Sequence, residues 1–355
     1  MSIEVAGLGW VTPLGAGLED VWNRLQRGDV AEAKTVANPE TGRAHVYAPV
    51  PLKVVDALAR NPRLRRSSAI SYFAVAAGLA ALEDAGITLT LESAARTAVV
   101  FAISSGGVVY TRKFYEQIVK QGANSASPLL FPETVYNAPA SHLAAQLSVD
   151  GASYTLVGDS TVGLAALKFA EQLLLTEDLD RVVVVGSEEI DWILCEAYRD
   201  WRLARGDQSS HGALLAEGAA AVVLAREGKA VLRVHDGIPV FRRSEAVPVL
   251  KRTCEELLGS QEPGVVIGSA NGTFVDRVES QVLTTVSPNA PVYFPKHALG
   301  EALGASALVQ VVAAFQALRH RELPGQSSEL EGDTALISTL GFNQQASAAL
   351  LRVRS

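Results

Sequence analysis

Short runs of Val, Ile, Leu and Ala recur along the whole chain, and segments with helical periodicity separate them. Each run is long enough for one buried strand. The sequence predicts strands at residues 3–8, 98–103, 181–186, 219–224, 231–234, 264–268, 292–294, 335–339 and 347–353. Strands that are apolar on both sides are typical of a sheet that is covered on both faces. Their alternation with helices predicts an α/β protein with mostly parallel sheets.

Three helical segments between these strands are the clearest. Residues 68–85 are rich in Ala and amphipathic, and residues 161–175 begin directly after a glycine-containing turn. Residues 302–318 are apolar nearly all round, so we expect that helix to be buried. The order of the elements restarts near Lys229, which predicts two related halves, residues 1–228 and 229–355.

Composition excludes several classes of protein. The chain has 355 residues, of which 48% are hydrophobic and 19% are charged, and this composition suits a large core. No apolar run reaches the ~18 residues of a membrane span, and the first residues do not resemble a secretion signal. The net charge of −7 argues against a general nucleic-acid binder. Cys195 and Cys254 are too few for a disulfide framework or a zinc cluster, so we expect a cytoplasmic protein.

Several segments rich in glycine and small residues occur in a fixed order. They are residues 5–15 (VAGLGWVTPLG), 74–86 (AVAAGLAALEDAG), 154–163 (YTLVGDSTVG), 216–219 (AEGA), 295–296 with 303–305 (PK and LGA), and 341–342 (GF). In order and spacing, this set resembles the β-ketoacyl synthases of the thiolase superfamily. The resemblance implies the thiolase fold, a five-layered α-β-α-β-α arrangement of two related halves that usually forms dimers. It implies no metal and no nucleotide cofactor, and the sequence contains no glycine-rich phosphate loop.

The resemblance places Ser160 where the family has its nucleophilic cysteine, which attacks an acyl thioester carried on an acyl carrier protein. A serine hydroxyl is a poor nucleophile unless a base lies beside it. Ser160 therefore either forms an acyl-enzyme with the help of a base or is a small polar residue left without a catalytic role.

Two histidines of the family are also replaced, by Asn271 and Glu301. Asparagine can donate a hydrogen bond to an oxyanion but cannot transfer a proton. An ionised carboxylate cannot donate at all, and it repels an enolate. Glu301 could act as a general base towards Ser160, or it could form a salt bridge with the retained Lys296. The resemblance also assigns Thr273 and Phe342 to the substrate pocket. Ordinary condensation is predicted to be blocked.

These replacements favour a chain-length-factor-type subunit of a polyketide or fatty-acid-like pathway. Such a subunit pairs with an active ketosynthase, handles carrier-bound acyl chains and does not itself condense them. The alternative is an enzyme with Ser160 as nucleophile that performs acyl transfer, thioester hydrolysis or cyclisation. A third reading is a homodimer that binds acyl chains without chemistry. Residues 106–147 resemble the family's dimer region and are rich in aromatic residues, which ordinary core packing would also explain.

The expected partners are an acyl carrier protein and a ketosynthase subunit, or a second copy of this chain. Carrier proteins are acidic, so a local basic patch is needed in a chain of net negative charge. The candidate docking residues are Arg60, Arg63, Arg65 and Arg66, with Arg112 and Lys113. A solvated helix start would account for the same arginines.

Overall fold

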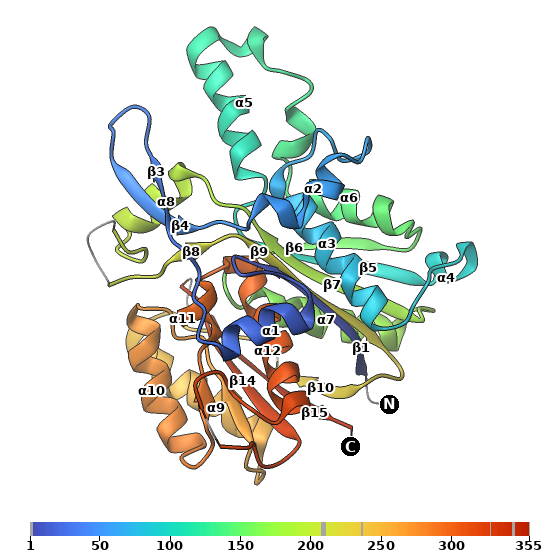
Figure 1. Ribbon diagram of the computed structural model, residues 1–355, viewed down its shortest axis with the longest axis vertical. Helices are drawn as coiled ribbons and strands as arrows, with labels where there is room; N and C mark the ends of the chain where they lie inside the picture. Colours follow the sequence, from blue (N-terminus) through green and yellow to red (C-terminus); the bar gives the residue numbers. More distant parts are fainter. Residues whose placement is uncertain (1–2, 207–210, 236, 327, 343–344, 355) are drawn as a thin grey trace.

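A computed structural model describes residues 3–206, 211–235, 237–326, 328–342 and 345–354. Its elements stack as five layers, helices alternating with sheets (Figure 1). The predicted α/β class and the thiolase fold are confirmed. Among the described residues, no helix is both long and apolar enough to cross a bilayer.

Two sets of five strands have the same order. The first set runs β1-β9-β7-β5-β6 and the second runs β10-β15-β14-β12-β13, and the two join through β1 and β10. The strands are β1 (Glu4–Thr12), β5 (Thr97–Ile103), β6 (Ser153–Val157), β7 (Arg181–Glu188), β9 (Gly218–Ala225), β10 (Ala230–Val234), β12 (Val265–Ile267), β13 (Val292–Tyr293), β14 (Thr334–Leu340) and β15 (Gln345–Val353). The division at residues 228 and 229 itself stays a prediction.

The expectation of mostly parallel sheets is wrong. In each set only the three strands at the far edge are parallel, and the two strands at the junction are antiparallel to their neighbours. An apolar run shows that a strand is buried but not which way it points. The alternation of elements therefore could not reveal that β9 and β15 run against β7 and β14.

The helices form the other three layers. Two central helices, α7 (Val162–Thr176) and α12 (Ser306–His320), lie between the two strand sets. One outer face is covered by α3 (Ala69–Asp84) and α6 (Ala138–Leu147), and the other by α9 (Ala246–Leu258) and α10 (Phe274–Val286). Every residue of α12 from Ser306 to Leu318 is buried, as its apolar pattern predicts.

Close packing of α3 on β1 depends on two glycines. A Cβ atom on Gly7 would lie 2.2 Å from the carbonyl oxygen of Ala81, and one on Gly9 would lie 2.4 Å from that of Ala77. No side chain fits at these distances, so the helix backbone rests directly on the strand. This explains Gly7 and Gly9 of the opening motif.

The remaining elements surround this stack. A small sheet contains β3 (Lys34–Ala37), β4 (Ala44–Ala48) and β8 (Leu215–Ala216), and the two-residue strands β2 (Gly15–Ala16) and β11 (Ile238–Pro239) pair with β1 and β15. The other helices are α1 (Leu18–Gln26), α2 (Asp56–Ala59), α4 (Leu91–Ala95), α5 (Val108–Gln121), α8 (Trp192–Asp200) and α11 (Pro295–Leu299). Single 3₁₀ turns are η1 (Leu52–Val54), η2 (Ala123–Ser125), η3 (Phe131–Thr134), η4 (Arg243–Glu245) and η5 (Leu303–Ala305).

Helix α5 differs from the others because it projects away from the body (Figure 1). The structure describes all of its residues, and none of them is buried. Together with η3 and the residues directly after it, α5 exposes large apolar side chains, including Tyr115 (58% exposed), Phe131 (55%) and Tyr136 (48%). The aromatic residues of this segment are therefore not core residues of the single chain.

Candidate functional site

Ser160 lies between the carboxyl end of β6 and the N-terminus of α7. It follows β6 by three residues and precedes the first residue of α7 by two. Strands β5, β6 and β7 are parallel, so their carboxyl ends lie along one edge of the sheet. This is the edge where ligands bind in open α/β sheets. The Ser160 side chain is buried, with 1% of the residue exposed.

A glycine turn brings Lys296 and Glu301 together. Helix α11 begins with Pro295 at its first position and ends at Leu299, before Gly300. Gly300 has a φ of +82°, a left-handed conformation that suits glycine at a helix end. The chain then turns back, and Glu301 forms a β-bridge with Leu215. Its backbone N–H donates to the carbonyl of Leu214, and its carbonyl accepts the N–H of Ala216. Both side chains are thereby directed inwards.

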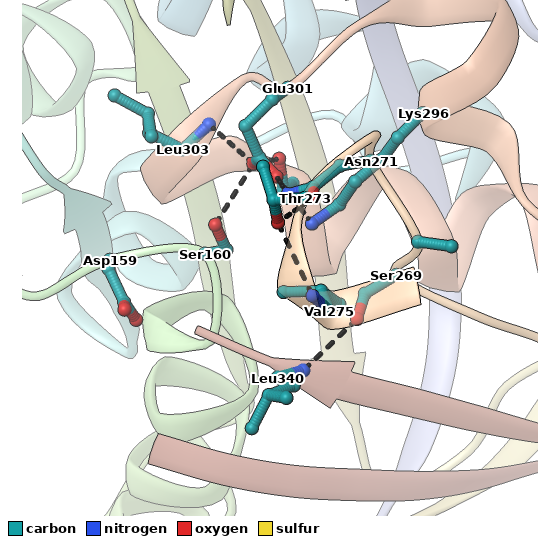
Figure 2. Close-up of polar contacts among 12 residues, drawn as sticks. Asp159, Ser160, Ser269, Asn271, Thr273, Val275, Lys296, Glu301, Leu303 and Leu340 are labelled. Atoms are coloured by element: carbon teal, nitrogen blue, oxygen red, sulfur yellow. Dashed lines mark hydrogen bonds and ion pairs between the residues drawn. The ribbon is translucent and has the colours of Figure 1, made fainter. Parts of the chain in front are cut away.

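Glu301 is the centre of the site (Figure 2). Its carboxylate accepts hydrogen bonds from five donors. The hydroxyls of Ser160 (3.0 Å) and Ser306 (2.5 Å) and the backbone N–H of Leu303 (3.1 Å) donate to Oε1. The Asn271 amide (2.7 Å) and the Lys296 ammonium (2.8 Å) donate to Oε2. The salt bridge expected between Lys296 and Glu301 is confirmed, and both oxygens of the carboxylate are occupied.

The charge of Glu301 is stabilised despite complete burial. Burial alone would raise the pKa of this carboxyl, since it penalises the charged form. The ammonium of Lys296 and the donors from Ser306 and Asn271 outweigh that penalty and lower the pKa below its ordinary value. A carboxylate with a lowered pKa is a weaker base, so Glu301 is poorly suited to take the proton of Ser160.

Asn271 is held in one orientation by its neighbours. Its backbone N–H donates to Asp276 (2.7 Å), and its side-chain oxygen accepts the hydroxyl of Thr273 (2.6 Å). Its amide N–H₂ group is thereby directed at Glu301. Thr273 also caps the start of α10 by accepting the N–H of Val275. Asn271 and Thr273 therefore belong to the same network as Ser160.

Phe342 lies close to the serine turn but outside this network. The turn at Gly341 packs on the residue before Ser160, since a Cβ on Gly341 would lie 2.2–2.5 Å from the Asp159 carboxylate. Phe342 makes an edge contact with Tyr198 of α8, with ring centroids 5.8 Å apart. The predicted positions thus converge, five of them through hydrogen bonds and Phe342 through packing.

One buried carboxyl near the site was not predicted from the sequence. Glu188, the last residue of β7, is fully buried and accepts the backbone N–H groups of Ser104, Ser105 and Gly304 and the Ser105 hydroxyl. Burial raises its pKa to about 7. In the described part of the chain, no Lys, Arg or His forms an ion pair with it. Two consecutive glutamates directly after an apolar strand run were the available signal.

The arrangement allows limited chemistry. It offers a hydroxyl, one ion pair and two amide or hydroxyl donors that are already engaged with each other. Each donor among these groups already contributes a hydrogen bond within the network. Within the described residues, no three His, Cys, Asp or Glu side chains are placed to hold a metal ion.

The sequence model of the β-ketoacyl synthase N-terminal domain matches residues 1–230. The chain therefore belongs to the β-ketoacyl synthase family, as its motifs predict.

Relatives in that family are distant. The chain is 24% identical over 244 residues to 3-oxoacyl-(acyl-carrier-protein) synthase 2 of Coxiella burnetii, a match that covers 62% of this chain and 57% of that protein. With the Vibrio harveyi protein of the same name it shares 25% over 189 residues, or 53% and 45% of the two chains. The chain thus spans about half the length of these relatives. A Streptomyces halstedii protein, provisionally named polyketide beta-ketoacyl synthase 2, is 26% identical over 98% of this chain and 96% of its own length.

Solved structures of the same fold cover the whole chain. The ishigamide ketosynthase/chain length factor superposes with a TM-score of 0.81 at 18% identity, covering 100% of both chains. The complex of the ketosynthase ApeO with its chain length factor ApeC, from Xenorhabdus doucetiae, superposes with a TM-score of 0.78 at 18% identity, covering 99% and 98%. At these identities the likeness establishes the fold.

Proposed function

We propose that this chain is a chain-length-factor-type subunit that does not condense acyl groups itself and pairs with an active ketosynthase. The observation that carries the proposal is the state of Glu301. Its carboxylate is ionised, paired with Lys296 and bound by four further donors. A family member that condenses needs a hydrogen-bond donor at this position, and a carboxylate in this state has no proton to donate.

The electrostatics of the site support the same conclusion. Decarboxylation of a malonyl group generates negative charge that the protein must stabilise. Here Glu301 is negative, and Lys296, the one cation bound to it, is already neutralised. Asp159 is directly adjacent to Ser160 in the chain and is also buried. A developing anion at Ser160 would lie beside the negative Glu301, whose nearby donors are already engaged.

The surface of the chain favours a partner subunit. The edge strand β6 has exposed Tyr154 and Val157, and α5 contributes exposed Tyr115 and Val119. An exposed strand edge with apolar side chains is a template for pairing with another chain. Large exposed apolar patches on soluble proteins mark interaction sites. A second thiolase-fold subunit would cover these side chains and extend the sheet.

A carrier protein has a basic loop available on the same chain. Arg60, Arg63, Arg65 and Arg66 are all exposed in the segment before α3. Arg112 is different from what the sequence predicts, since its guanidinium is held by Asp191 (2.9 Å) and Glu116 (3.1 Å). We therefore assign carrier docking to the four loop arginines, keep the exposed Lys113 as a separate candidate, and leave Arg112 out of that surface.

The experiment is co-expression of the chain with cysteine-bearing β-ketoacyl synthases of the same source organism. We expect one of them to co-purify at equal stoichiometry and to extend acyl groups on carrier protein only when paired. Tyr115→Arg, on the exposed face of α5, should break the complex, while Lys53→Glu, an exposed residue outside that surface, should not. Chain extension by the purified chain alone would overturn the proposal.

A second function has one observation in its favour, the hydrogen bond from Ser160 to Glu301 at 3.0 Å. In that interpretation, Ser160 attacks the carbonyl of a carrier-bound thioester and Glu301 receives the hydroxyl proton; the C–S bond breaks, and the carrier leaves as its thiol with that proton. The test is intact mass after incubation with acyl-loaded carrier protein, for the wild type and Ser160→Ala. An acyl adduct that is present in the wild type and lost in Ser160→Ala would establish a serine acyl-enzyme. We expect no adduct, because the pKa of Glu301 is lowered.

A further inference from the structure

The turn η5 (Leu303–Ala305) lies between two buried carboxyl groups, those of Glu301 and Glu188. The N–H of Leu303 donates to Glu301 Oε1 at 3.1 Å, and the next residue, Gly304, lies against the Glu188 carboxyl, where its backbone amide lowers the pKa of that group. Two consecutive amides of one short turn thus face two different carboxyls. The position of Glu301 relative to Ser160 therefore depends on where this turn lies.

The backbone of η5 needs such support. Leu303 has a φ of +40°, in the left-handed region that costs a residue with a side chain roughly 1 kcal/mol. The turn is also pressed onto the strands, since a Cβ on Gly304 would lie 2.8 Å from Glu188 Oε1 and 2.9 Å from Ile103. Strained backbone persists where surrounding contacts hold it, and here the contacts are the two carboxyls.

Glu188 connects this turn to the end of β5. Its carboxylate accepts the N–H groups of Ser104 and Ser105 and the Ser105 hydroxyl, all of which lie between β5 and α5. We propose that Glu188 is a positioning residue of the serine site: it holds η5 against the end of β5, and η5 in turn holds Glu301 towards Ser160.

The groups around Glu188 make this contact responsive to pH. Tyr198 of α8 interacts with the charge of Glu188, Glu301 lies on the other side of η5, and Glu189 is the neighbour of Glu188 in the chain. Below the pKa of about 7 the carboxyl is protonated and accepts the Gly304 and Ser104 amides less strongly. Above pH 7 the Glu188 carboxylate is charged and binds both amides more strongly. The turn η5 is therefore held more tightly as the pH rises.

The test uses the isolated chain with Ser160→Cys, whose thiol reports on access to the site. Alkylation by iodoacetamide is measured between pH 6 and 8.5 and divided by the thiolate fraction of Cys at this position. Cys195 and Cys254 should not be alkylated, because burial raises the pKa of each thiol to about 12. We expect the corrected rate to fall severalfold through a midpoint near pH 7. Adding Glu188→Gln should remove this step and leave the rate high throughout.

The matched control is Glu279→Gln in the same Ser160→Cys background. Glu279 is as buried as Glu188 and also has a pKa of about 7, but its partners are Ser269, Ala270 and Ser338 rather than η5. This control should keep the step. A step that persists in Glu188→Gln, or that disappears equally in Glu279→Gln, would overturn the assignment.

A milder variant covers the case in which Glu188→Gln does not fold. Ser105→Ala removes one donor to the charged carboxylate, so the midpoint should move to higher pH without being lost. An unchanged midpoint would contradict the role of Glu188. These measurements need neither a partner subunit nor a carrier protein, so their outcome is independent of the proposed pairing function.

Discussion

Glu301 and Glu279 are both completely buried, yet their acidities are shifted in opposite directions. Glu279 accepts the N–H groups of Ser269 (2.6 Å) and Ala270 (3.0 Å) and the hydroxyls of Ser269 (3.0 Å) and Ser338 (2.7 Å). With these four neutral donors, burial still raises its pKa to about 7, and Lys296 lowers that pKa only through its charge at a distance, without an ion pair. Glu301 has a similar set of neutral donors and a salt bridge with Lys296, and its pKa is lowered.

The difference shows that neutral hydrogen bonds alone do not offset the burial of a carboxylate in this protein, and that the adjacent ammonium decides its charge. The serine site is therefore a closed ion pair, whereas the Glu279 cluster can exchange a proton near neutral pH. Three sets of substitutions would test this distinction.

The largest effect is expected from Lys296→Met, which removes the cation and leaves Glu301 buried without a counter-ion. Breaking one partner of a buried ion pair costs roughly 3–5 kcal/mol. The free energy of unfolding, measured by urea denaturation at pH 8, should fall by about that amount. The double variant Lys296→Met/Glu301→Gln should recover much of the loss. If Lys296→Met alone costs less than Lys251→Met, a change in an exposed pair on α9, the ion pair does not hold the site.

An intermediate effect is expected in the pH dependence. Between the ordinary carboxyl pKa and about 7, the folded chain keeps a proton on Glu279 that the unfolded chain has lost, so stability falls as the pH rises. Glu279→Gln should reduce this slope by at most about 1.4 kcal/mol per pH unit. The contribution of Glu301 is present above its ordinary pKa and is lost only below it. Glu301→Gln should therefore leave the slope between pH 5 and 7 unchanged, and thermal unfolding across that range would reveal any exception.

The smallest effect concerns single hydroxyl donors. Ser306→Ala removes one donor to Glu301, and Ser338→Ala removes one donor to Glu279. Each should cost roughly 1–2 kcal/mol at pH 8, where both carboxyls are charged. At pH 6 the cost of Ser338→Ala should shrink, because Glu279 is then mostly protonated, while that of Ser306→Ala should stay the same. Equal pH dependence of the two costs would remove the distinction between the clusters.

The sequence identifies most of the fold because the buried strands are continuous apolar runs. It does not predict β6, whose residues Ser153, Tyr154 and Thr155 are polar or aromatic and lie at the exposed edge. This chain does not cover that edge strand, and the strand lacks the continuous apolar pattern of a buried one. Its direction and its neighbours follow from long-range pairing with β5, which no local pattern encodes.

The site, like the fold, has parts that the sequence predicts and parts that it does not. Ser160, Asn271, Lys296 and Glu301 could be found because each occupies a fixed place in a motif. Glu188 could not, since its partners are backbone amides 83 and 84 positions earlier, near Ser104 and Ser105, and backbone donors leave no residue signature. Exposure of the aromatic segment also escaped the sequence, because a helix that awaits a partner has the same composition as one packed in a core.

The Lys296–Glu301 pair also limits how such a site can change over generations. Replacement of Glu301 by histidine alone would leave the buried ammonium without its counter-ion, at a cost of roughly 3–5 kcal/mol. Loss of Lys296 first would leave the Glu301 carboxylate buried without a counter-ion, at a similar cost. Either single replacement therefore lowers the stability of this chain, and a return to the family's lysine and histidine needs a compensating change around Lys296.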